Sequence, residues 1–428
     1  MSKEEMYVPE EVNERALLVG VDKPHSPWPL ESSLAELARL AETAGAEVLG
    51  TTTQRLDKVN PRTFVGQGKA EEIAGLCTSL AVDVVIFDDE LTPSQQANLE
   101  KTVPKEVKVI DRTALILDIF ALHATSKEGR LQVRLAQNEY LYPRLRGMWA
   151  HLASNRMGGG VGSRFGEGES QLEVDRRIVR NRITSIKRQL KDLERNRSLQ
   201  RKDRYESGIF KVALAGYTNA GKSSLLNALT GAQVLSYDKL FATLDAKSKK
   251  LVLPEGREVT VTDTVGLIQK LPTDLVESFN STLDEIRGAD LILHVVDAAQ
   301  PEYEEQMKTV DRVLEQIGAG DIARVEVFNK IDLLAPDEAE SLRLRKPDAL
   351  FVSTMTGEGL EGLKDYIAQK AADTGVIMDV VIPYSRGDLV SMAHERCHIL
   401  DEGHSADGTT MRVQVSAPLQ GTFARFRV

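Results

Sequence analysis

Cysteines are scarce in this sequence and long apolar runs are missing, and each shortage excludes a class of protein. Only Cys77 and Cys397 are present, so no disulfide framework is expected. No apolar run approaches the roughly 20 residues of a membrane-spanning helix. The acidic first 15 residues lack the apolar core of a secretion signal. We therefore expect a soluble, reduced, cytoplasmic protein with no membrane span.

Positive charge is also in short supply overall. The chain has 54 Lys and Arg against 64 Asp and Glu, a formal net charge of −10. This balance argues against a protein coated in basic charge for indiscriminate DNA binding. Hydrophobic residues make up 42% of the chain and charged residues 28%, which excludes wholesale disorder. Its 428 residues allow two to four domains at roughly 100–200 residues each.

The first 124 residues alternate short β-branched runs with helical stretches. We expect strands at 16–21, 84–87 and 107–110. Ser33 is expected to cap one helix, and Thr92, with Pro93 next and Gln95 at the capping-box position, is expected to cap another. Strands that alternate with helices predict a small α/β domain with a mostly parallel sheet.

Residues 125–207 lose the strand pattern. Apolar residues spaced by four and three predict a helix with a coiled-coil-like seam, formed by Val179, Ile183, Ile186, Leu190 and Leu193. A weaker series lies upstream, where we expect Pro143 to end or kink the helix. The glycine-rich stretch 158–168 separates the two series. The pattern predicts two long antiparallel helices joined by a glycine-rich loop.

The second of these helices is locally basic. Residues 175–204 contain twelve Lys and Arg and only four acids. One interpretation is a solvated helix face. The other is a surface for RNA phosphates, because an excess of eight positive charges is unusual in an acidic protein.

A second α/β pattern spans residues 208–372 and opens on a phosphate-binding motif. The strand 210–215 runs into Gly216-Tyr217-Thr218-Asn219-Ala220-Gly221-Lys222-Ser223, and a helical segment follows. This is G-x-x-x-x-G-K-[ST] in its required strand–loop–helix setting. Backbone N–H groups and the helix N-terminus favour phosphate. Lys222 is predicted to reach the β- and γ-phosphates, and Ser223 to bind Mg²⁺.

Two later motifs, taken in order after the P-loop, predict which nucleotide binds. A strand at 259–262 leads to Asp263-Thr264-Val265-Gly266, whose Asp263 is predicted to hold Mg²⁺ through water and whose Gly266 amide is predicted to sense the γ-phosphate. A strand at 292–296 follows, and then 325–328 leads to Asn329-Lys330-Ile331-Asp332. The Asp332 carboxylate can accept from guanine N1–H and its amine, whereas adenine would leave it unpaired. The ordered motifs predict GTP rather than ATP.

Residues 373–428 form a shorter final part. Strands are expected at 376–382 and 411–415, and we predict a small α+β domain.

Motifs in every part resemble the HflX family of ribosome-associated GTPases. They include Asp111–Phe120, the glycine-rich loop with Gln171-Leu172-Glu173, the P-loop, Leu240–Asp245 and Ile382–Asp388. The resemblance implies an N-terminal nucleotide-binding-like domain (1–124), a helical hairpin (125–207), a P-loop GTPase or G domain (208–372) and a C-terminal domain (373–428). It also implies binding to the large ribosomal subunit and GTP-dependent splitting or rescue of stalled ribosomes.

The resemblance assigns roles to further residues. Thr243 is the implied switch threonine, which coordinates Mg²⁺ and contacts the γ-phosphate. Lys222, Thr243 and Gly266 form the predicted catalytic set, and Ser223, Thr243 and Asp263 the predicted Mg²⁺ set. The complete predicted GTP-binding set is Gly216, Tyr217, Thr218, Asn219, Ala220, Gly221, Lys222, Ser223, Ser224, Phe241, Ala242, Thr243, Asp263, Thr264, Val265, Gly266, Asn329, Lys330, Asp332, Ser353, Thr354 and Met355. The predicted RNA contacts are Arg156, Arg164, Arg176, Arg177 and Arg180.

Two residues bear on the rate of hydrolysis. Leu267 occupies the position where many small GTPases have a water-orienting Gln, so we predict slow hydrolysis that a partner accelerates. The same Leu also fits a core-facing strand end. Asn219 has two interpretations, a ligand for K⁺ beside the phosphates or a choice made for loop geometry.

Three functions remain open from the sequence. The first is a GTPase that remodels ribosomes, acting as a monomer with GTP and GDP, rRNA and Mg²⁺ as partners. The second is an RNA-binding assembly or modification factor in which GTP orders a switch. The third is an ATP-dependent RNA-remodelling protein. Asn329–Asp332 argues against ATP in the central domain, whereas the N-terminal domain leaves an ATP site open.

Overall fold

The computed structural model of the chain describes residues 13–24, 26–155, 167–206, 209–231, 240–241, 243–254, 256–270, 280–373 and 375–428. The chain divides into two compact units, residues 1–122 with 133–186, and residues 123–132 with 187–428. Within the described residues, no helix combines the length and the apolar character that crossing a membrane requires.

The first unit contains a four-stranded parallel sheet in the order β2-β1-β3-β4. Its strands are β1 (Arg15–Asp22), β2 (Glu47–Arg55), β3 (Val84–Phe87) and β4 (Lys108–Asp111), so the three predicted strands are confirmed and β2 is added. Helices alternate with them: α1 (Leu30–Thr43), α2 (Gln67–Ser79), α3 (Pro93–Glu100) and α4 (Arg112–His123). One face of the sheet buries Val19, Val85 and Phe87 in a core shared with α2 and α3.

The predicted capping box at Thr92 is confirmed. Thr92 Oγ1 accepts from the Gln95 backbone N–H at 3.3 Å, and Gln95 Oε1 accepts from the Thr92 N–H at 3.0 Å. The predicted cap at Ser33 is wrong, because α1 begins at Leu30 and Ser33 lies inside it. The Ser33 hydroxyl instead donates to Asp88 at 2.7 Å. Asp88 in turn pairs with the fully buried Arg112, so the serine serves a buried ionic cluster.

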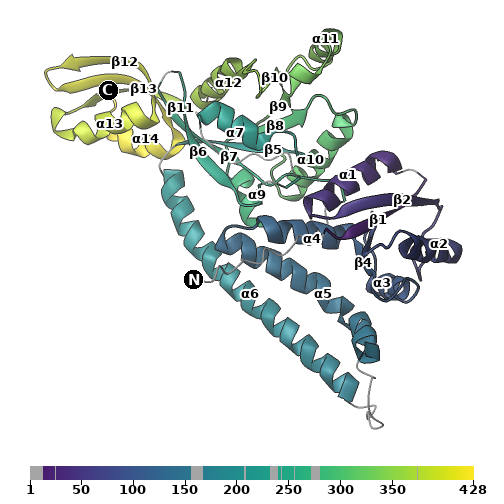
Figure 1. Cartoon of the computed structure of the whole chain (residues 1–428). Coiled ribbons are helices and arrows are strands. Elements are labelled where there is room, and N and C mark those ends of the chain that lie inside the picture. The colour runs from purple at the N-terminus through teal and green to yellow at the C-terminus, as the bar shows by residue number, and fades with distance from the viewer. Residues whose placement is uncertain are drawn as a thin grey trace, which may run out of the picture. The chain divides into compact units, whose positions relative to one another are not determined.

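Helices α5 (Lys127–Asn155) and α6 (Glu167–Glu206) confirm the two predicted long helices, and they lie side by side (Figure 1). Of the predicted seam, Val179 and Ile186 are buried, whereas Ile183, Leu190 and Leu193 are half-buried. Arg180 of α6 donates to the Tyr142 hydroxyl of α5 at 2.6 Å. The glycine-rich stretch lies mostly outside the described residues.

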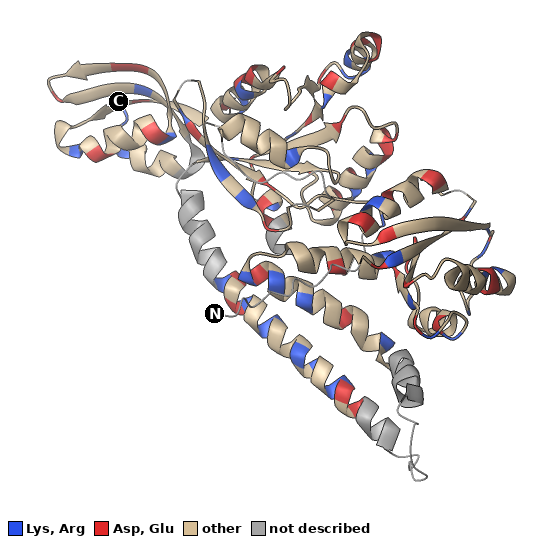
Figure 2. Ribbon diagram, viewed as in Figure 1, with Lys and Arg blue, Asp and Glu red and all other residues tan. Residues whose placement is uncertain are grey.

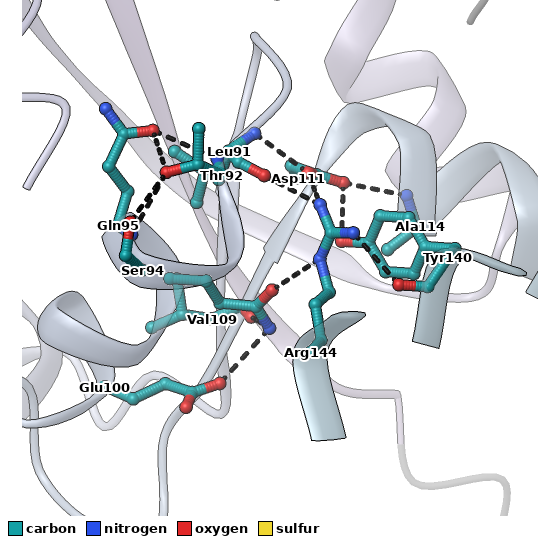
Figure 3. Close-up of polar contacts among 11 residues, drawn as sticks. Leu91, Thr92, Ser94, Gln95, Glu100, Val109, Asp111, Ala114, Tyr140 and Arg144 are labelled. Carbon is teal, nitrogen blue, oxygen red and sulfur yellow. Dashed lines mark hydrogen bonds and ion pairs between the residues drawn. The ribbon is translucent and has the colours of Figure 1, made fainter. Parts of the chain in front are cut away.

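Helix α5 does not end at Pro143, contrary to one of the two outcomes expected there. Side chains next to the proline hold the helix against the end of β4 (Figure 3). The Tyr140 hydroxyl donates to Asp111 Oδ1 at 2.9 Å, and Arg144 Nη2 donates to the Leu91 carbonyl at 2.7 Å. These contacts stabilise the helical path on both sides of the residue that lacks a backbone donor.

The second unit contains a six-stranded sheet in the order β10-β9-β8-β5-β7-β6. It is parallel except for the edge strand β6, which pairs antiparallel with β7. The strands are β5 (Phe210–Gly216), β6 (Lys247–Val252), β7 (Glu258–Asp263), β8 (Leu291–Asp297), β9 (Arg324–Asn329) and β10 (Leu350–Phe351). The predicted strands at 210–215, 259–262, 292–296 and 325–328 are confirmed.

Successive residues of the central strands enter two different cores, because side chains of a strand alternate between faces. Val295 and Val327 pack with α7 (Lys222–Thr230) and α12 (Leu360–Asp373). Phe328 packs instead with Met307 of α10 (Tyr303–Gln316) and Leu342 of α11 (Pro336–Arg345). Helix α9 (Asn280–Arg287) precedes β8. Layers of helix on both faces of a mostly parallel sheet are the predicted α/β arrangement.

The chain ends in an antiparallel sheet of order β11-β13-β12, built from β11 (Gly375–Ile382), β12 (His398–Ser405) and β13 (Gly408–Ser416). The predicted strands at 376–382 and 411–415 are confirmed, whereas β12 had not been predicted. Helices α13 (Gly387–Arg396) and α14 (Ala417–Phe423) contribute Leu389 and Phe423 to its core. The predicted multidomain fold class is therefore confirmed. The exact boundaries between its four parts stay predictions.

Candidate functional site

The P-loop joins β5 to α7 and closes around Lys222. The backbone at Gly221 has φ +91°, a left-handed conformation that glycine adopts without strain. A Cβ there would collide with the side-chain nitrogen of Asn329. The Lys222 ammonium is buried and donates to the carbonyls of Gly216 at 3.1 Å and Tyr217 at 2.7 Å. Burial lowers the pKa of Lys222 to about 8, and the negative charge of Asp263 opposes that shift.

Three oxygen-bearing side chains meet beside the P-loop. The Ser223 hydroxyl donates to Asp263 Oδ2 at 2.6 Å and lies 2.9 Å from the Thr243 hydroxyl. Asp263 Oδ1 is buried and has no hydrogen-bond partner within the described residues. Burial raises the pKa of Asp263, and Lys222, Ser223 and Thr243 oppose the rise. The predicted Mg²⁺ residues are therefore neighbours, and one buried carboxylate oxygen is left to accept.

The segment after β7, residues 264–267, is held to the P-loop by backbone hydrogen bonds. Leu267 N–H donates to the Gly216 carbonyl at 3.1 Å, and Thr218 N–H donates to the Leu267 carbonyl at 2.8 Å. The Leu267 side chain is only 1% exposed. It therefore faces the core, in line with the interpretation of Leu267 as a core-facing strand end. A Cβ at Gly266 would lie 2.8 Å from Thr218 Cγ2. No side chain fits between this segment and the P-loop.

Thr264 and Val265 complete that segment. The Thr264 hydroxyl donates to the Leu214 carbonyl at 2.7 Å, and both residues are buried. They therefore hold the backbone that presents Gly266 rather than offering side chains to a ligand.

The predicted base-selecting motif, residues 329–332, follows β9 and contacts the P-loop through Asn329. Asn329 Nδ2 donates to the Ala220 carbonyl at 3.0 Å, and its Oδ1 accepts from Thr354 N–H at 3.2 Å. Lys330 has φ 64° and its ammonium pairs with Asp297 Oδ2 at 2.8 Å. Asp332 is exposed. The three motifs, which are spread over residues 216–332, converge at the same ends of β5, β7 and β9.

The remaining predicted residues occupy varied positions. Ser353 is buried and its hydroxyl accepts from Thr356 N–H at 3.1 Å, whereas Met355 is 85% exposed. Asn219 and Phe241 adopt φ 60° and 57°, and Ser224 is half-buried in α7. Arg177 and Arg180 are exposed on α6, where basic residues recur along the described part of the helix, and Arg176 is half-buried (Figure 2). Ala242, Arg156 and Arg164 lie outside the described residues.

Two carboxylates at this site were missed by sequence reasoning. Asp297 ends β8 and pairs with Lys330. Asp245 follows Thr243 by two residues and accepts four hydrogen bonds from Thr125 and Ser126. The position of Asp297 at a strand end was a usable signal, because ligands of α/β sheets gather at the carboxyl ends of strands. For Asp245 no local signal exists, since its partners are about 120 residues away.

Three family models match: "GTP-binding GTPase N-terminal" over residues 31–121, "GTP-binding GTPase Middle Region" over 123–204 and "50S ribosome-binding GTPase" over 211–330. Among solved structures, a GTP-binding protein from Sulfolobus solfataricus in complex with GDP is 23% identical, with a TM-score of 0.44, over 84% of this chain and 99% of that one.

Curated relatives cover nearly the whole chain. "GTPase HflX" of Caldanaerobacter subterraneus subsp. tengcongensis is 45% identical over 96% of this chain and 94% of its own length. "GTPase HflX" of Escherichia coli K12 is 41% identical over 90% of each chain. With the P-loop, Asp263 and Asn329 assembled at one sheet edge, these likenesses show that the chain belongs to the HflX family of GTPases.

Proposed function

We propose that this GTPase binds the large ribosomal subunit and uses GTP binding and hydrolysis to split or rescue stalled ribosomes. One observation carries the proposal: Asn329 of the base-selecting motif donates to Ala220 of the P-loop at 3.0 Å, so the guanine and phosphate elements form a single site. The family model over residues 211–330, described as a 50S ribosome-binding GTPase, supports the choice of partner. Loss of a γ-phosphate from such a site reorders nearby segments, which lets hydrolysis drive a change in binding.

The phosphate end of the site consists of Lys222 and the Gly266 amide. The Lys222 ammonium lies 3.3 Å from the place that a Cβ at Gly266 would occupy. A γ-phosphate in this space would meet a cation on one side and a backbone donor on the other. Both contacts stabilise charge that develops on the transferred phosphoryl group, which is the main catalytic contribution of such sites.

The Mg²⁺ ion fits the oxygen cluster beside the P-loop. Ser223 and Thr243 supply hydroxyl oxygens, and Asp263 Oδ1 is a buried acceptor without a partner within the described residues. Hard oxygen ligands are those Mg²⁺ prefers, and it commonly keeps several waters. We assign Ser223 and Thr243 as direct ligands and Asp263 as a ligand through water. When bound, the ion neutralises charge on the β- and γ-phosphates.

Guanine is recognised at the other end. Asp332 is exposed and can accept from N1–H and the exocyclic amine of the base. Asn329 and the Thr354 backbone are joined at 3.2 Å, which holds the loop 353–355 beside the base. Lys330 is fixed by Asp297 and contributes its aliphatic stem as a platform.

Hydrolysis is predicted to be slow without the ribosome. Leu267 is buried and has no polar atom on its side chain to orient water. Asn219 keeps its two interpretations: a φ of 60° favours Asn on conformational grounds alone, and a K⁺ ligand at this point would neutralise transition-state charge. Hydrolysis rates measured in K⁺ and in Na⁺ decide between them, because loop geometry alone predicts equal rates.

The exposed basic face of α6 is the proposed rRNA contact. Arg177 and Arg180 project from it, and Arg180 is positioned by its hydrogen bond to Tyr142 at 2.6 Å. Arginine suits this role because its planar guanidinium pairs with phosphate and stacks on bases. The predicted contacts Arg156 and Arg164 belong to the same proposal.

Steady-state GTP hydrolysis, alone and with purified large ribosomal subunits, tests the proposed function. We expect a slow basal rate that rises strongly with large subunits, and no hydrolysis in either condition for Lys222→Ala. A basal rate that large subunits leave unchanged would contradict the proposal. That outcome would favour the assembly or RNA-modification GTPase, which needs a different activator.

Two further expectations concern the first unit and the assembly state. The stretch Gly66-Gln67-Gly68-Lys69 superficially resembles a phosphate-binding loop. Gly66 is the N-cap residue of α2, and the Lys69 ammonium pairs with the Glu72 carboxylate at 2.8 Å. An ATP site in this domain therefore stays a prediction, which titration with a fluorescent ATP analogue tests. A monomer is also expected, and sedimentation of the full chain with GDP checks it.

A further inference from the structure

Asp245 makes an unusually complete set of hydrogen bonds just after the switch threonine. Its Oδ2 accepts from Thr125 N–H at 3.0 Å, from the Thr125 hydroxyl at 2.7 Å and from Ser126 N–H at 2.7 Å. Its Oδ1 accepts from the Ser126 hydroxyl at 2.5 Å. All of these groups belong to the same compact unit as the P-loop. An ionised carboxylate has about four acceptor sites, and these four donors match that number.

The partners of Asp245 form the start of helix α5. Ser126 directly precedes the helix, and its hydroxyl accepts from Gly129 N–H at 2.8 Å while donating to Asp245. The Asp245 carboxylate therefore occupies the positive end of the helix, where an anion is stabilised. A Cβ at Gly129 would collide with Asp245 Oδ1, so the glycine leaves room for the carboxylate.

The nucleotide site lies on the other side of Asp245, only two residues away. The Thr243 hydroxyl lies 2.9 Å from the Ser223 hydroxyl. Leu244, which separates Thr243 from Asp245 in the sequence, is 2% exposed. Consecutive Cα atoms are about 3.8 Å apart, and the buried Leu244 holds the backbone between Thr243 and Asp245 in place. Neither of these two residues can therefore move far without the other. A displacement of Thr243 by several ångströms would therefore break contacts of Asp245.

We propose that Asp245 is a positioning residue that latches the switch threonine to the first turn of α5. This latch consists of Asp245, Thr125 and Ser126. When closed, it holds Thr243 toward the γ-phosphate and Mg²⁺. When Thr243 leaves that position after hydrolysis, Asp245 withdraws from the start of α5. The state of the nucleotide thereby reaches the first helix of the hairpin, whose second helix, α6, carries Arg177 and Arg180. The inference rests on the proposed role of Thr243.

Nucleotide preference provides the first test. The affinities of a non-hydrolysable GTP analogue and of GDP are measured for the wild-type chain and for Asp245→Ala, Thr125→Val and Thr243→Ala. We expect Asp245→Ala to lower the ratio of analogue to GDP affinity about tenfold, within the range of coupling between sites. Thr125→Val removes one of the four donors and should give a smaller fall. GDP affinity should change less, because GDP lacks the γ-phosphate toward which the latch holds Thr243.

Asp290→Ala is the matched control. Asp290 also accepts a backbone N–H, that of Lys211 at 2.8 Å, but at the opposite end of β5 from the P-loop. Asp290 is exposed, and it shares with Asp245 the acceptance of a backbone N–H from a segment distant in sequence. Its loss should lower stability without changing the nucleotide ratio.

Hydrogen exchange at residues 126–132 supplies a readout that does not depend on activity. In the wild-type chain these amides should be more protected with the GTP analogue than with GDP, and Asp245→Ala should abolish the difference. The latch alone would be overturned if Asp245→Ala left both the ratio of analogue to GDP affinity and the amide protection unchanged, while Thr243→Ala lowered that affinity ratio. An unchanged ratio in Thr243→Ala would overturn the role of Thr243, and the latch with it.

Discussion

His294 gives the G domain a stability that should fall in mild acid. The residue lies on the central strand β8 and is 2% exposed. Burial lowers its pKa from 6.5 to about 3, and the positive charges of Arg324, Lys222 and Lys346 add to the shift. Asp311 lies 3.8 Å from Nδ1, which is too far for a hydrogen bond. The imidazole is therefore neutral in the folded protein at all ordinary pH values.

The sign and size of the effect follow from proton linkage. Between pH 6.5 and 3 the unfolded chain binds a proton at His294 that the folded chain does not. Above pH 6.5 protonation of His294 does not reduce the free energy of unfolding. Below pH 6.5 it reduces that free energy by about 1.4 kcal/mol for each pH unit. From pH 7 to pH 5 the G domain should lose about 2 kcal/mol through this group alone. Such a loss is a sizeable part of the stability of an ordinary domain.

Urea unfolding of the full chain at pH 7 and pH 5 measures this loss. Trp28 and Trp149 lie outside residues 208–372, so release of a fluorescent GDP analogue is the better reporter for the G domain. Every other titrating group is retained in His294→Gln, so the difference between the two chains isolates His294. The wild-type chain should lose about 2 kcal/mol more than the variant.

His404→Gln supplies a control for the loss of an imidazole outside residues 208–372, and we expect it to leave the unfolding transition of the G domain as in the wild-type chain. Equal losses in the wild-type chain and His294→Gln would refute the conclusion that burial holds this imidazole neutral.

Three further predictions concern the nucleotide and RNA sites. Asp332→Asn should weaken GTP binding about 100-fold or more, because guanine loses its carboxylate acceptor, and a xanthine nucleotide should bind better than GTP in the same fluorescence titration. Gly266→Ala should slow hydrolysis at least about tenfold, since its Cβ lies 2.8 Å from a P-loop methyl group, whereas Gly320→Ala, with 3.7 Å to its nearest neighbour, should not. Charge reversal of Arg177 and Arg180 should weaken co-sedimentation with large subunits and leave the basal GTPase rate unchanged. The slope of the logarithm of the binding constant against the logarithm of the salt concentration should fall by about one for each arginine.

Much of the fold and of the nucleotide site could be predicted because the signals are local. The capping box at Thr92 and Gln95 involves residues three apart, and the structure confirms it. The buried strands of the G domain are short apolar runs, and the P-loop lies on consecutive residues between a strand and a helix. Because parallel strands present their carboxyl ends at one edge, motifs at the ends of β5, β7 and β9 had to converge.

Where prediction failed, a distant partner outweighed the local signal. Ser33 has the chemistry of a helix cap, yet it donates to Asp88, 55 residues later, inside a buried ionic cluster. Of the two outcomes expected at Pro143, an end of the helix does not occur, because its neighbours Tyr140 and Arg144 hold α5 at the end of β4. Intrinsic helix preferences amount to at most about 3 kcal/mol for each residue, and several buried contacts exceed that.

The sequence by itself therefore determined the family, the alternation of strands and helices and the identity of the nucleotide. Each rests on periodicity or on motifs of a few adjacent residues. Only the tertiary structure decided that Asp263 keeps a buried oxygen without a partner in the described part of the chain, that Asn329 joins base and phosphate elements, and that Asp245 caps a helix 119 residues upstream. The reason is that a carboxylate or amide takes its role from the donors and acceptors around it, and folding brings these together from distant parts of the chain.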